Sequence, residues 1–196
     1  MNKALIIFIK NAVAGKVKTR LAQGIGEEMA LKYYKALLNH TRTVAEEVDA
    51  MRYLYYSESV EKNDRWDSDR FIKRTQEGAD LGARMYKAFQ EVKEVKKIII
   101  GSDCPQITTL DLEQAFDSLD HHELVIGPAN DGGYYLLGVK EVYKELFLDM
   151  EWSVESVFKE TKERANKLNL KVKILRELVD LDTVEDLKIS GFKLEE

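Results

Sequence analysis

Residues 97–105 read Lys97-Ile98-Ile99-Ile100-Gly101-Ser102-Asp103-Cys104-Pro105, and this stretch determines how the rest of the chain is interpreted. The isoleucine run predicts a buried central strand that ends at Gly101, directly before an acidic side chain. A carboxylate at the tip of a buried parallel strand is costly unless water, a helix N-terminus or a cation satisfies it. Asp103 is therefore interpreted either as a ligand of a hard cation such as Mg²⁺ or as the cap of a helix that follows Pro105.

The apolar and amphipathic stretches around this strand alternate, which predicts a mostly parallel sheet flanked by helices. Further strands are expected at residues 4–9, 51–56, 71–74, 124–126, 134–139 and 171–175. A loop is expected at residues 10–26, followed by a long helix whose buried face carries Ala30, Tyr33, Leu37, Thr41, Val44 and Val48. Other helices are expected at residues 81–92, 108–119, 153–168 with Ser153 as N-cap, and 183–189. Residues 1–196 contain no repeat or linker, so a single domain is predicted.

Composition excludes several classes of protein. Hydrophobic residues make up 44% of the 196 residues, and the apolar runs are too short to cross a bilayer. A net charge of -5 disfavours a nucleic-acid partner. Cys104 is the only cysteine, so a Cys-rich zinc site is excluded, and the residue is interpreted as a small semi-buried side chain. No signal-peptide cleavage site follows the N-terminal residues, and a cytoplasmic location is predicted.

The first loop carries several basic residues directly after a buried strand. Lys16, Lys18 and Arg20 follow Gly15, which allows backbone N–H groups to approach an anion. Ligands collect at the carboxyl ends of strands in open α/β sheets, so this loop is a candidate phosphate-binding segment. It is not a P-loop, because Val17 stands where that motif needs Ser or Thr. A solvated basic loop is the alternative.

Two further carboxylates follow the last expected strand. Asp180 and Asp182 are two residues apart, so in an extended segment they point to the same side. Such a pair repels itself unless a cation lies between the two groups. Asp182 or Thr183 could instead cap the last helix, but capping does not account for Asp180.

The segment Gly127-Pro128-Ala129-Asn130-Asp131-Gly132-Gly133 is the densest turn signal in the chain. Its paired glycines permit positive φ and close approach of the backbone to a ligand. An ordinary tight turn between two strands is the alternative. Trp152 is interpreted either as a ligand platform or, as is more common, as a core aromatic.

Together these segments resemble the radical-SAM/selenodomain-associated transferases, glycosyltransferase-A-like proteins related to the guanylyltransferases of deazaflavin-cofactor biosynthesis. The segments that match are AGKVKTRL, QEGADLGARM, GSDCP, GPANDGGYYLLG, EWS and DLDTVEDL, in order along nearly the whole chain. The resemblance implies a three-layer α/β/α nucleotide-diphospho-sugar transferase fold with a mostly parallel, mixed sheet. One departure is Asn11, where relatives often carry proline, and it is expected to loosen the entry to the first loop.

The resemblance also implies a role for each segment. Divalent metal, Mg²⁺ or Mn²⁺, would be bound by Asp103, Asp180 and Asp182. The nucleotide or its phosphates would contact Gly15, Lys16, Lys18, Arg20, Gln76, Leu81 and Gly82. The acceptor substrate would contact Gly127, Pro128, Asp131, Gly132, Gly133 and Trp152. Lys18 and Asp131 are the catalytic candidates, as a source of positive charge and as a base for an acceptor hydroxyl.

Three functions fit these residues. The first, which the sequence favours, is a metal-dependent glycosyltransferase that uses a nucleotide-sugar donor and a small-molecule acceptor. The second is a nucleotidyltransferase that joins an NTP to a phosphorylated acid and releases pyrophosphate. The third is a nucleotide-binding module without turnover, against which the joint presence of three aspartates and the basic loop argues. The sequence does not indicate the donor base, the acceptor or the oligomeric state.

Overall fold

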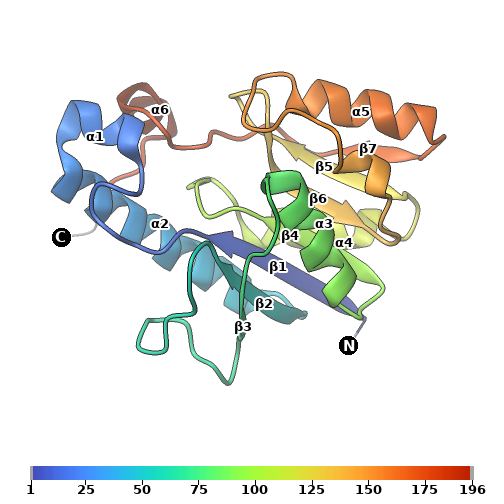
Figure 1. Ribbon diagram of the computed structural model, residues 1–196, viewed down its shortest axis with the longest axis horizontal. Helices are drawn as coiled ribbons and strands as arrows, with labels where there is room; N and C mark the ends of the chain where they lie inside the picture. The colour runs from blue at the N-terminus through green and yellow to red at the C-terminus, as the bar shows by residue number, and fades with distance from the viewer. Residues whose placement is uncertain (1, 195–196) are drawn as a thin grey trace.

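The computed structural model describes residues 2–194 of the chain, and a seven-stranded sheet forms its centre (Figure 1). The strand order is β3-β2-β1-β4-β6-β5-β7. β6 pairs antiparallel with β4 and β5, and the other neighbours are parallel, which confirms the mostly parallel, mixed sheet. The strands are β1 Lys3–Ile9, β2 Met51–Tyr56, β3 Ile72–Thr75, β4 Lys96–Ile100, β5 Leu124–Pro128, β6 Tyr134–Val139 and β7 Val172–Ile174.

Helices cover both faces of the sheet, as predicted for three layers. Helices α2 and α4 pack on one face, and α3 and α5 on the other. A small third cluster joins α1, α2 and α6 beside the sheet (Figure 1). The helices are α1 Thr19–Ile25, α2 Glu27–Glu47, α3 Leu81–Glu91, α4 Thr109–Ser118, the 3₁₀ turn η1 Lys144–Leu146, α5 Val157–Lys167 and α6 Val184–Ser190.

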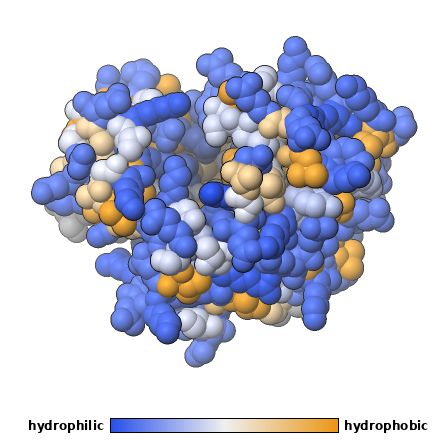
Figure 2. Space-filling view, viewed as in Figure 1, coloured by the Kyte–Doolittle hydropathy of each residue, from blue (hydrophilic) through white to orange (hydrophobic). Residues whose placement is uncertain are grey.

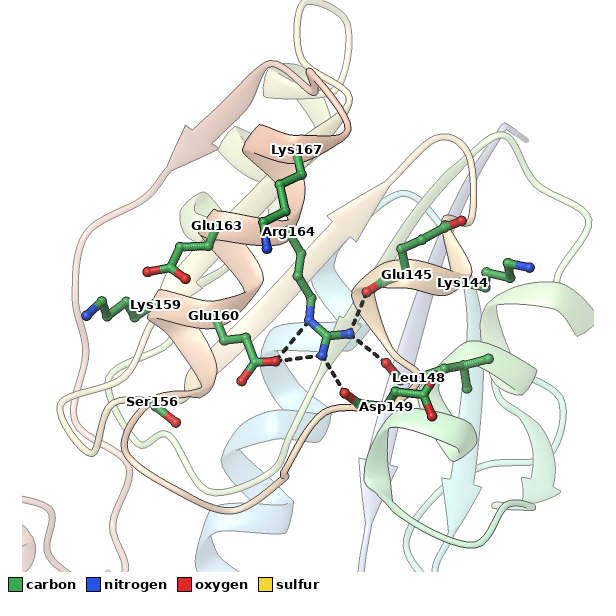
Figure 3. A pocket seen from close by; sticks show the side chains of 10 residues that line it. All are labelled: Lys144, Glu145, Leu148, Asp149, Ser156, Lys159, Glu160, Glu163, Arg164 and Lys167. Carbon is green, nitrogen blue, oxygen red and sulfur yellow. Dashed lines mark hydrogen bonds and ion pairs between the residues drawn. The ribbon is translucent and has the colours of Figure 1, made fainter.

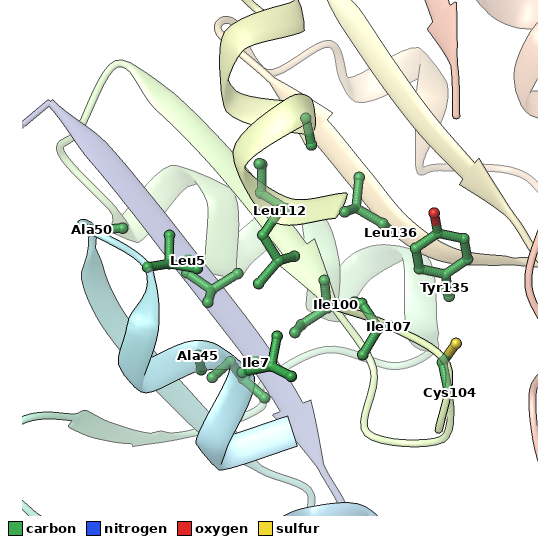
Figure 4. Packing of buried hydrophobic residues seen from close by; sticks show 14 of the residues in the cluster. Leu5, Ile7, Ala45, Ala50, Ile100, Cys104, Ile107, Leu112, Tyr135 and Leu136 are labelled. Atoms are coloured by element: carbon green, nitrogen blue, oxygen red, sulfur yellow. The ribbon is translucent and has the colours of Figure 1, made fainter. Parts of the chain in front are cut away.

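Strand β1 shows why a continuous apolar run becomes a central strand. Side chains alternate across the sheet, so Leu5 and Ile7 join the α2/α4 face while Ala4 and Ile6 join the α3/α5 face. Figure 4 shows Leu5 and Ile7 packed in the same cluster as Leu112 of α4. Burial on both faces leaves no room for polar residues along the strand.

The structure corrects two predictions about helices, one on where a helix exists and one on where a helix begins. The segment predicted as a loop over residues 10–26 contains α1, whose Leu21 and Ile25 lie four residues apart and pack toward α2 and α6. Ser153 is not the N-cap of α5, which begins at Val157. Ser153 has a left-handed φ of 64°, whereas an N-cap residue is extended.

One residue on the buried face of α2 also differs from the prediction. Tyr34, not Tyr33, is buried toward the sheet, while Tyr33 packs near Phe192 in the third cluster. Among the described residues, no helix combines the length and the hydrophobicity that crossing a membrane requires.

Candidate active site

The ammonium group of Lys18 lies between two of the predicted metal-binding carboxylates. Its Nζ is 2.7 Å from Asp103 Oδ1 and 3.3 Å from Asp182 Oδ1. The Lys18 side chain is only 3% exposed, whereas the two carboxylates remain partly open to solvent. Burial alone would lower the pKa of Lys18, but the charges of Asp103 and Asp182 outweigh it and hold the pKa above its ordinary value. Lys18 is therefore a buried cation under a partly exposed acidic surface.

The backbone of Lys18 is as unusual as its side chain. Lys18 adopts φ 49° and ψ 43°, the left-handed conformation that non-glycine residues rarely adopt. It directly precedes α1, so the turn delivers the side chain inward while the helix leaves the sheet. Such conformations cost about 1–3 kcal/mol and persist where the surroundings determine them. Here the ion pairs with Asp103 and Asp182 supply that determination.

Asp180 reaches the same site from the other end of the chain. Residues 175–180 continue beside β5 after β7 ends, with hydrogen bonds from Leu175 N to Ile126 O and from Leu178 N to Pro128 O. Leu181 N then donates to Asp103 O at 2.9 Å. Burial, followed by the charges of Asp103 and Asp131, raises the pKa of the Asp180 carboxyl to about 8, although Lys18 opposes the shift.

The structure resolves the two capping alternatives. Thr108, not Asp103, caps α4, in a capping box with Asp111. Thr183, not Asp182, caps α6, in a capping box with Asp186. Asp103 and Asp182 are therefore free of these roles.

The three aspartates converge but do not form a ready-made metal cluster. Within residues 2–194, no group of three or more His, Cys, Asp or Glu side chains stands in a geometry that could hold a metal ion. The Lys18 ammonium occupies the space between Asp103 and Asp182 instead. The three aspartates therefore lie near one another, as predicted for a common metal site. The Lys18 ammonium neutralises part of their negative charge.

The other basic residues of segment 10–26 are open to solvent. Lys16 pairs with Glu58 at 3.4 Å, and Arg20 lies 3.8 Å from Asp182. Gly15 has a φ of 74°, which requires glycine. Asn11 was expected to loosen the entry to the loop, but its side chain is anchored. Its Nδ2 donates to Ser59 O at 2.8 Å, and its Oδ1 accepts from Glu58 N at 3.1 Å.

Of the three residues between 76 and 82 that are predicted to contact the nucleotide, two serve the protein's own packing. The Gln76 amide donates to the carbonyls of Ile9 and Tyr55, both at 3.1 Å, and so joins the ends of β1 and β2. A Cβ on Gly82 would lie 2.3 Å from Trp152 Nε1, so glycine is needed for the indole to pack there. Leu81 remains 40% exposed at the start of α3.

Trp152, predicted to contact substrate, is partly buried against the α3/α5 face. Its Nε1 donates to Phe147 O at 3.3 Å, and its ring meets Tyr134 edge-on. The indole N–H and one aromatic contact are thus used within the protein, which favours the core-aromatic interpretation.

The turn at residues 127–133 connects the antiparallel strands β5 and β6. Gly127 packs under the Tyr135 ring, where a Cβ would lie 2.4 Å from it, and Pro128 is buried in β5. Gly132 has a φ of 85°, and a Cβ there would lie 2.1 Å from Glu155 O. The close backbone approach predicted for this glycine is therefore to the 153–158 loop.

The end of the same turn is open. Asp131 is exposed, and its Oδ1 accepts a hydrogen bond from Gly133 N at 2.9 Å. Its charge still reaches Asp180, whose pKa it helps to raise. Asp131 and Gly133 thus remain at the open side of the site, while Gly127, Pro128 and Gly132 hold the turn in place.

Two polar residues at the site were not among the predicted ones. Tyr34 of α2 is buried, donates to Lys10 O at 3.0 Å and accepts from Lys10 N at 2.8 Å. Asn130 accepts from Asp180 N at 3.1 Å. No local pattern marks either residue, because a helix-face tyrosine and a turn asparagine are both common outside active sites.

Cys104, next to Asp103, is confirmed as a buried side chain. Burial, followed by the charge of Asp180, raises the pKa of its thiol to about 12. A thiol with such a pKa is not an activated nucleophile.

The molecular surface has a notch between two groups of elements. Figure 2 shows a mostly hydrophilic face, with a notch between the lobe of α1 and α6 and the part that carries β5 and α5. A cavity of about 800 Å³ borders the start of the first loop at Lys10 and Asn11, and extends along α2.

Another cavity of about 650 Å³ lies between η1 and α5 (Figure 3). Its Arg164 is held by Glu160 and by the carbonyls of Glu145, Leu148 and Asp149. This arginine ties α5 to the η1 segment, and the predicted site residues do not line the cavity.

Residues 40–154 match the family described as uncharacterized protein conserved in bacteria (DUF2064). The chain belongs to this family. It is also similar to 2-phospho-L-lactate guanylyltransferase of Methanocaldococcus vulcanius, at 27% identity over 186 residues, which covers 93% of this chain and 82% of that protein.

Solved structures are similar over almost the whole chain. A Desulfovibrio desulfuricans G20 protein described as a nucleotide-diphospho-sugar transferase superimposes with a TM-score of 0.89 at 28% identity, covering 96% of this chain and 85% of that one. Rv0371c of Mycobacterium tuberculosis H37Rv, solved with manganese, has a TM-score of 0.57 at 14% identity, covering 96% and 97%. The latter likeness shows the fold alone. Together the comparisons confirm the nucleotide-diphospho-sugar transferase fold and the transferase class.

Proposed function

We propose that the chain is a nucleotidyltransferase that joins an NTP to a phosphorylated small acid and releases pyrophosphate. The observation that carries this proposal is the buried Lys18 ammonium beside Asp103 and Asp182, at the carboxyl ends of the strands. A fixed cation that faces a solvent-open acidic surface suits a reaction whose reactants are phosphate groups. The similarity to guanylyltransferases makes GTP the first donor to test.

In this reaction an oxygen of the acceptor phosphate attacks the α-phosphorus of the NTP. The bond from that phosphorus to the bridging oxygen breaks, and pyrophosphate leaves with the electron pair. Lys18 and Arg20 are the cations of the first loop nearest the carboxylates, and they would stabilise the charge that develops on the leaving group. The attacking phosphate oxygen is already anionic at neutral pH, so the reaction requires no base.

The site residues supply the oxygen ligands that a divalent metal prefers, although they do not stand in a ready-made coordination geometry. Asp103, Asp131, Asp180 and Asp182 place four carboxylates near one another, against the two cations Lys18 and Arg20. Burial, followed by this excess of negative charge, raises the pKa of Asp180. Asp103 and Asp180, with Asp182 beside them, would hold Mg²⁺ or Mn²⁺, and the metal would neutralise phosphate charge and orient the phosphates.

Glycosyl transfer from a nucleotide sugar is the weaker hypothesis. It needs a base for an acceptor hydroxyl, and the candidate Asp131 is exposed and accepts the hydrogen bond from Gly133 N. The curated relatives found by sequence are guanylyltransferases, which also favours nucleotidyl transfer.

The test measures pyrophosphate release with a panel of NTPs, GTP first, and phosphorylated 2-hydroxy acids, in Mg²⁺ or Mn²⁺. We expect release with at least one pair, and a loss of at least about 100-fold in Asp103→Asn at a temperature where thermal unfolding shows the variant to be folded. Asp117→Asn, which alters an exposed carboxylate on α4, is the matched control and should keep full activity. Sugar transfer from a nucleotide-sugar panel without pyrophosphate release would overturn the proposal.

A further inference from the structure

The side chain of Asn130 joins three segments that meet at the site. It belongs to the turn between β5 and β6, and its Oδ1 accepts from the backbone N–H of Asp180 at 3.1 Å. Its Nδ2 donates to Asp186 Oδ1 at 3.4 Å. Its own backbone N–H donates to Leu178 O at 3.0 Å. Asn130 therefore holds the segment that carries Asp180 on both sides of that residue.

Asp186 uses its two oxygens for different purposes. Oδ2 accepts from the backbone N–H groups of Asp182 and Thr183, at 3.1 and 2.8 Å, and from the Thr183 hydroxyl at 2.7 Å. Oδ1 faces Asn130. The residue that completes the capping box of α6 is thus also the acceptor for Asn130.

The residue after Asp180 is anchored to the opposite side of the site. Leu181 N donates to Asp103 O at 2.9 Å, and the Leu181 side chain is fully buried. The two successive N–H groups of residues 180 and 181 therefore point to different partners, one in the turn and one in the Asp103 loop. This arrangement sets the direction in which the Asp180 carboxyl leaves the backbone.

We propose that Asn130 is a positioning residue that orients Asp180 and thereby couples the turn at residues 127–133 to the carboxylates around Lys18. The catalytic consequence rests on the proposed function. An acceptor that shifts this turn would shift Asp180 with it, through the contact between Asn130 and the Asp180 backbone.

The first experiment measures amide hydrogen exchange at Asp180 without any ligand, which tests the contact independently of the reaction. In Asn130→Ala, we expect exchange at residue 180 to accelerate about 10-fold, since one hydrogen bond is worth roughly a factor of ten. Mn²⁺ affinity and the rate of pyrophosphate release should fall by a similar factor. Asn63→Ala, an exposed asparagine in another loop, should leave all three unchanged.

A charge swap separates positioning from simple loss of stability. Asn130→Asp alone places a carboxylate against Asp186 and should be worse than Asn130→Ala. In Asn130→Asp combined with Asp186→Asn, the new carboxylate at residue 130 still accepts from Asp180 N. The new side-chain amide at residue 186 donates to that carboxylate. The amide oxygen of residue 186 can still accept in the capping box. We expect the double variant to recover exchange protection, Mn²⁺ affinity and rate to within about 3-fold of the unaltered protein.

The outcomes are distinguishable. Unchanged exchange at Asp180 in Asn130→Ala overturns the inference whatever the reaction is. Faster exchange with unaltered Mn²⁺ affinity and rate, or a double variant no better than Asn130→Asp, also overturns it. If the unaltered protein releases no pyrophosphate with any donor, the proposed function fails, and exchange together with Mn²⁺ affinity still decides the role of Asn130.

Discussion

The two sides of the site are held together by different forces. On the side proposed to bind the donor (the donor side), Lys18 is fixed by ion pairs with Asp103 and Asp182, and its backbone is in a strained left-handed conformation. On the side proposed to bind the acceptor (the acceptor side), the turn at residues 127–133 is fixed by backbone hydrogen bonds and by glycines that fit against neighbouring segments. Charge therefore positions the first side, and shape and hydrogen bonding position the second. Asp180 belongs to both sides, because its backbone follows the turn while its charge faces Lys18.

The largest expected effect comes from removing the cation of the donor side. In Lys18→Met the carboxylates lose their buried partner, and we expect pyrophosphate release to fall by about 100- to 1,000-fold. Steady-state kinetics checks this. Lys32→Met, an exposed lysine on α2, is the control and should remain fully active. A loss smaller than about 5-fold in Lys18→Met would show that charge does not organise the donor side.

Two glycines with nearly the same φ test whether shape organises the acceptor side. Gly132 has a φ of 85° and Gly26 a φ of 84°, but only Gly132 has backbone atoms close to where a Cβ would stand. We expect Gly132→Ala to lower the free energy of unfolding by about 3–4 kcal/mol, from strain and overlap together. Gly26→Ala should lose less, about 1–3 kcal/mol, from strain alone, because nothing lies within 4 Å of its Cβ position. Denaturant unfolding measures both, and equal losses would argue against the close fit at Glu155.

The pH dependence of stability tests, without a substrate, whether charge organises the donor side. Because the pKa of Asp180 is raised to about 8 in the folded protein, the folded state binds more protons than the unfolded state between about pH 4 and pH 8. The free energy of unfolding of the metal-free protein should therefore fall as the pH rises through that range. Asp180→Asn should flatten this slope and stabilise the protein by about 1–2 kcal/mol at pH 9. A slope unaffected by the substitution would contradict the assigned environment.

The smallest effects concern the two capping boxes, which differ in what they support. Thr183→Ala and Thr108→Ala should each cost about 1 kcal/mol of stability, because each removes a helix N-cap. Only Thr183 lies beside Asp182, so only Thr183→Ala should also slow pyrophosphate release, by about 3- to 10-fold. Thermal unfolding and kinetics on both variants check this. Equal activity of the two would show that the α6 cap stabilises the helix without supporting the site.

Features that depend on neighbouring residues were predictable. Both capping boxes follow from a threonine and an aspartate three residues apart, and β1 follows from its uninterrupted apolar run. The start of α5 was not predictable from neighbouring residues. The left-handed backbone at Ser153 depends on how the 149–156 segment packs and not on its composition. The packing roles of Gly82 and Gly132 could not be predicted from neighbouring residues either, since the atoms that exclude a Cβ come from residues far along the chain.

The sequence by itself determined the alternation of strands and helices and the presence of acidic and basic groups at strand ends. These follow from side-chain periodicity and from the order of residues along the chain. Only the tertiary structure decided that Lys18 lies between Asp103 and Asp182, and that Asn130 holds the backbone of Asp180. Ion pairs and hydrogen bonds of this kind depend on distances of a few ångströms between segments that are 50 to 164 residues apart, and the folded sheet sets those distances.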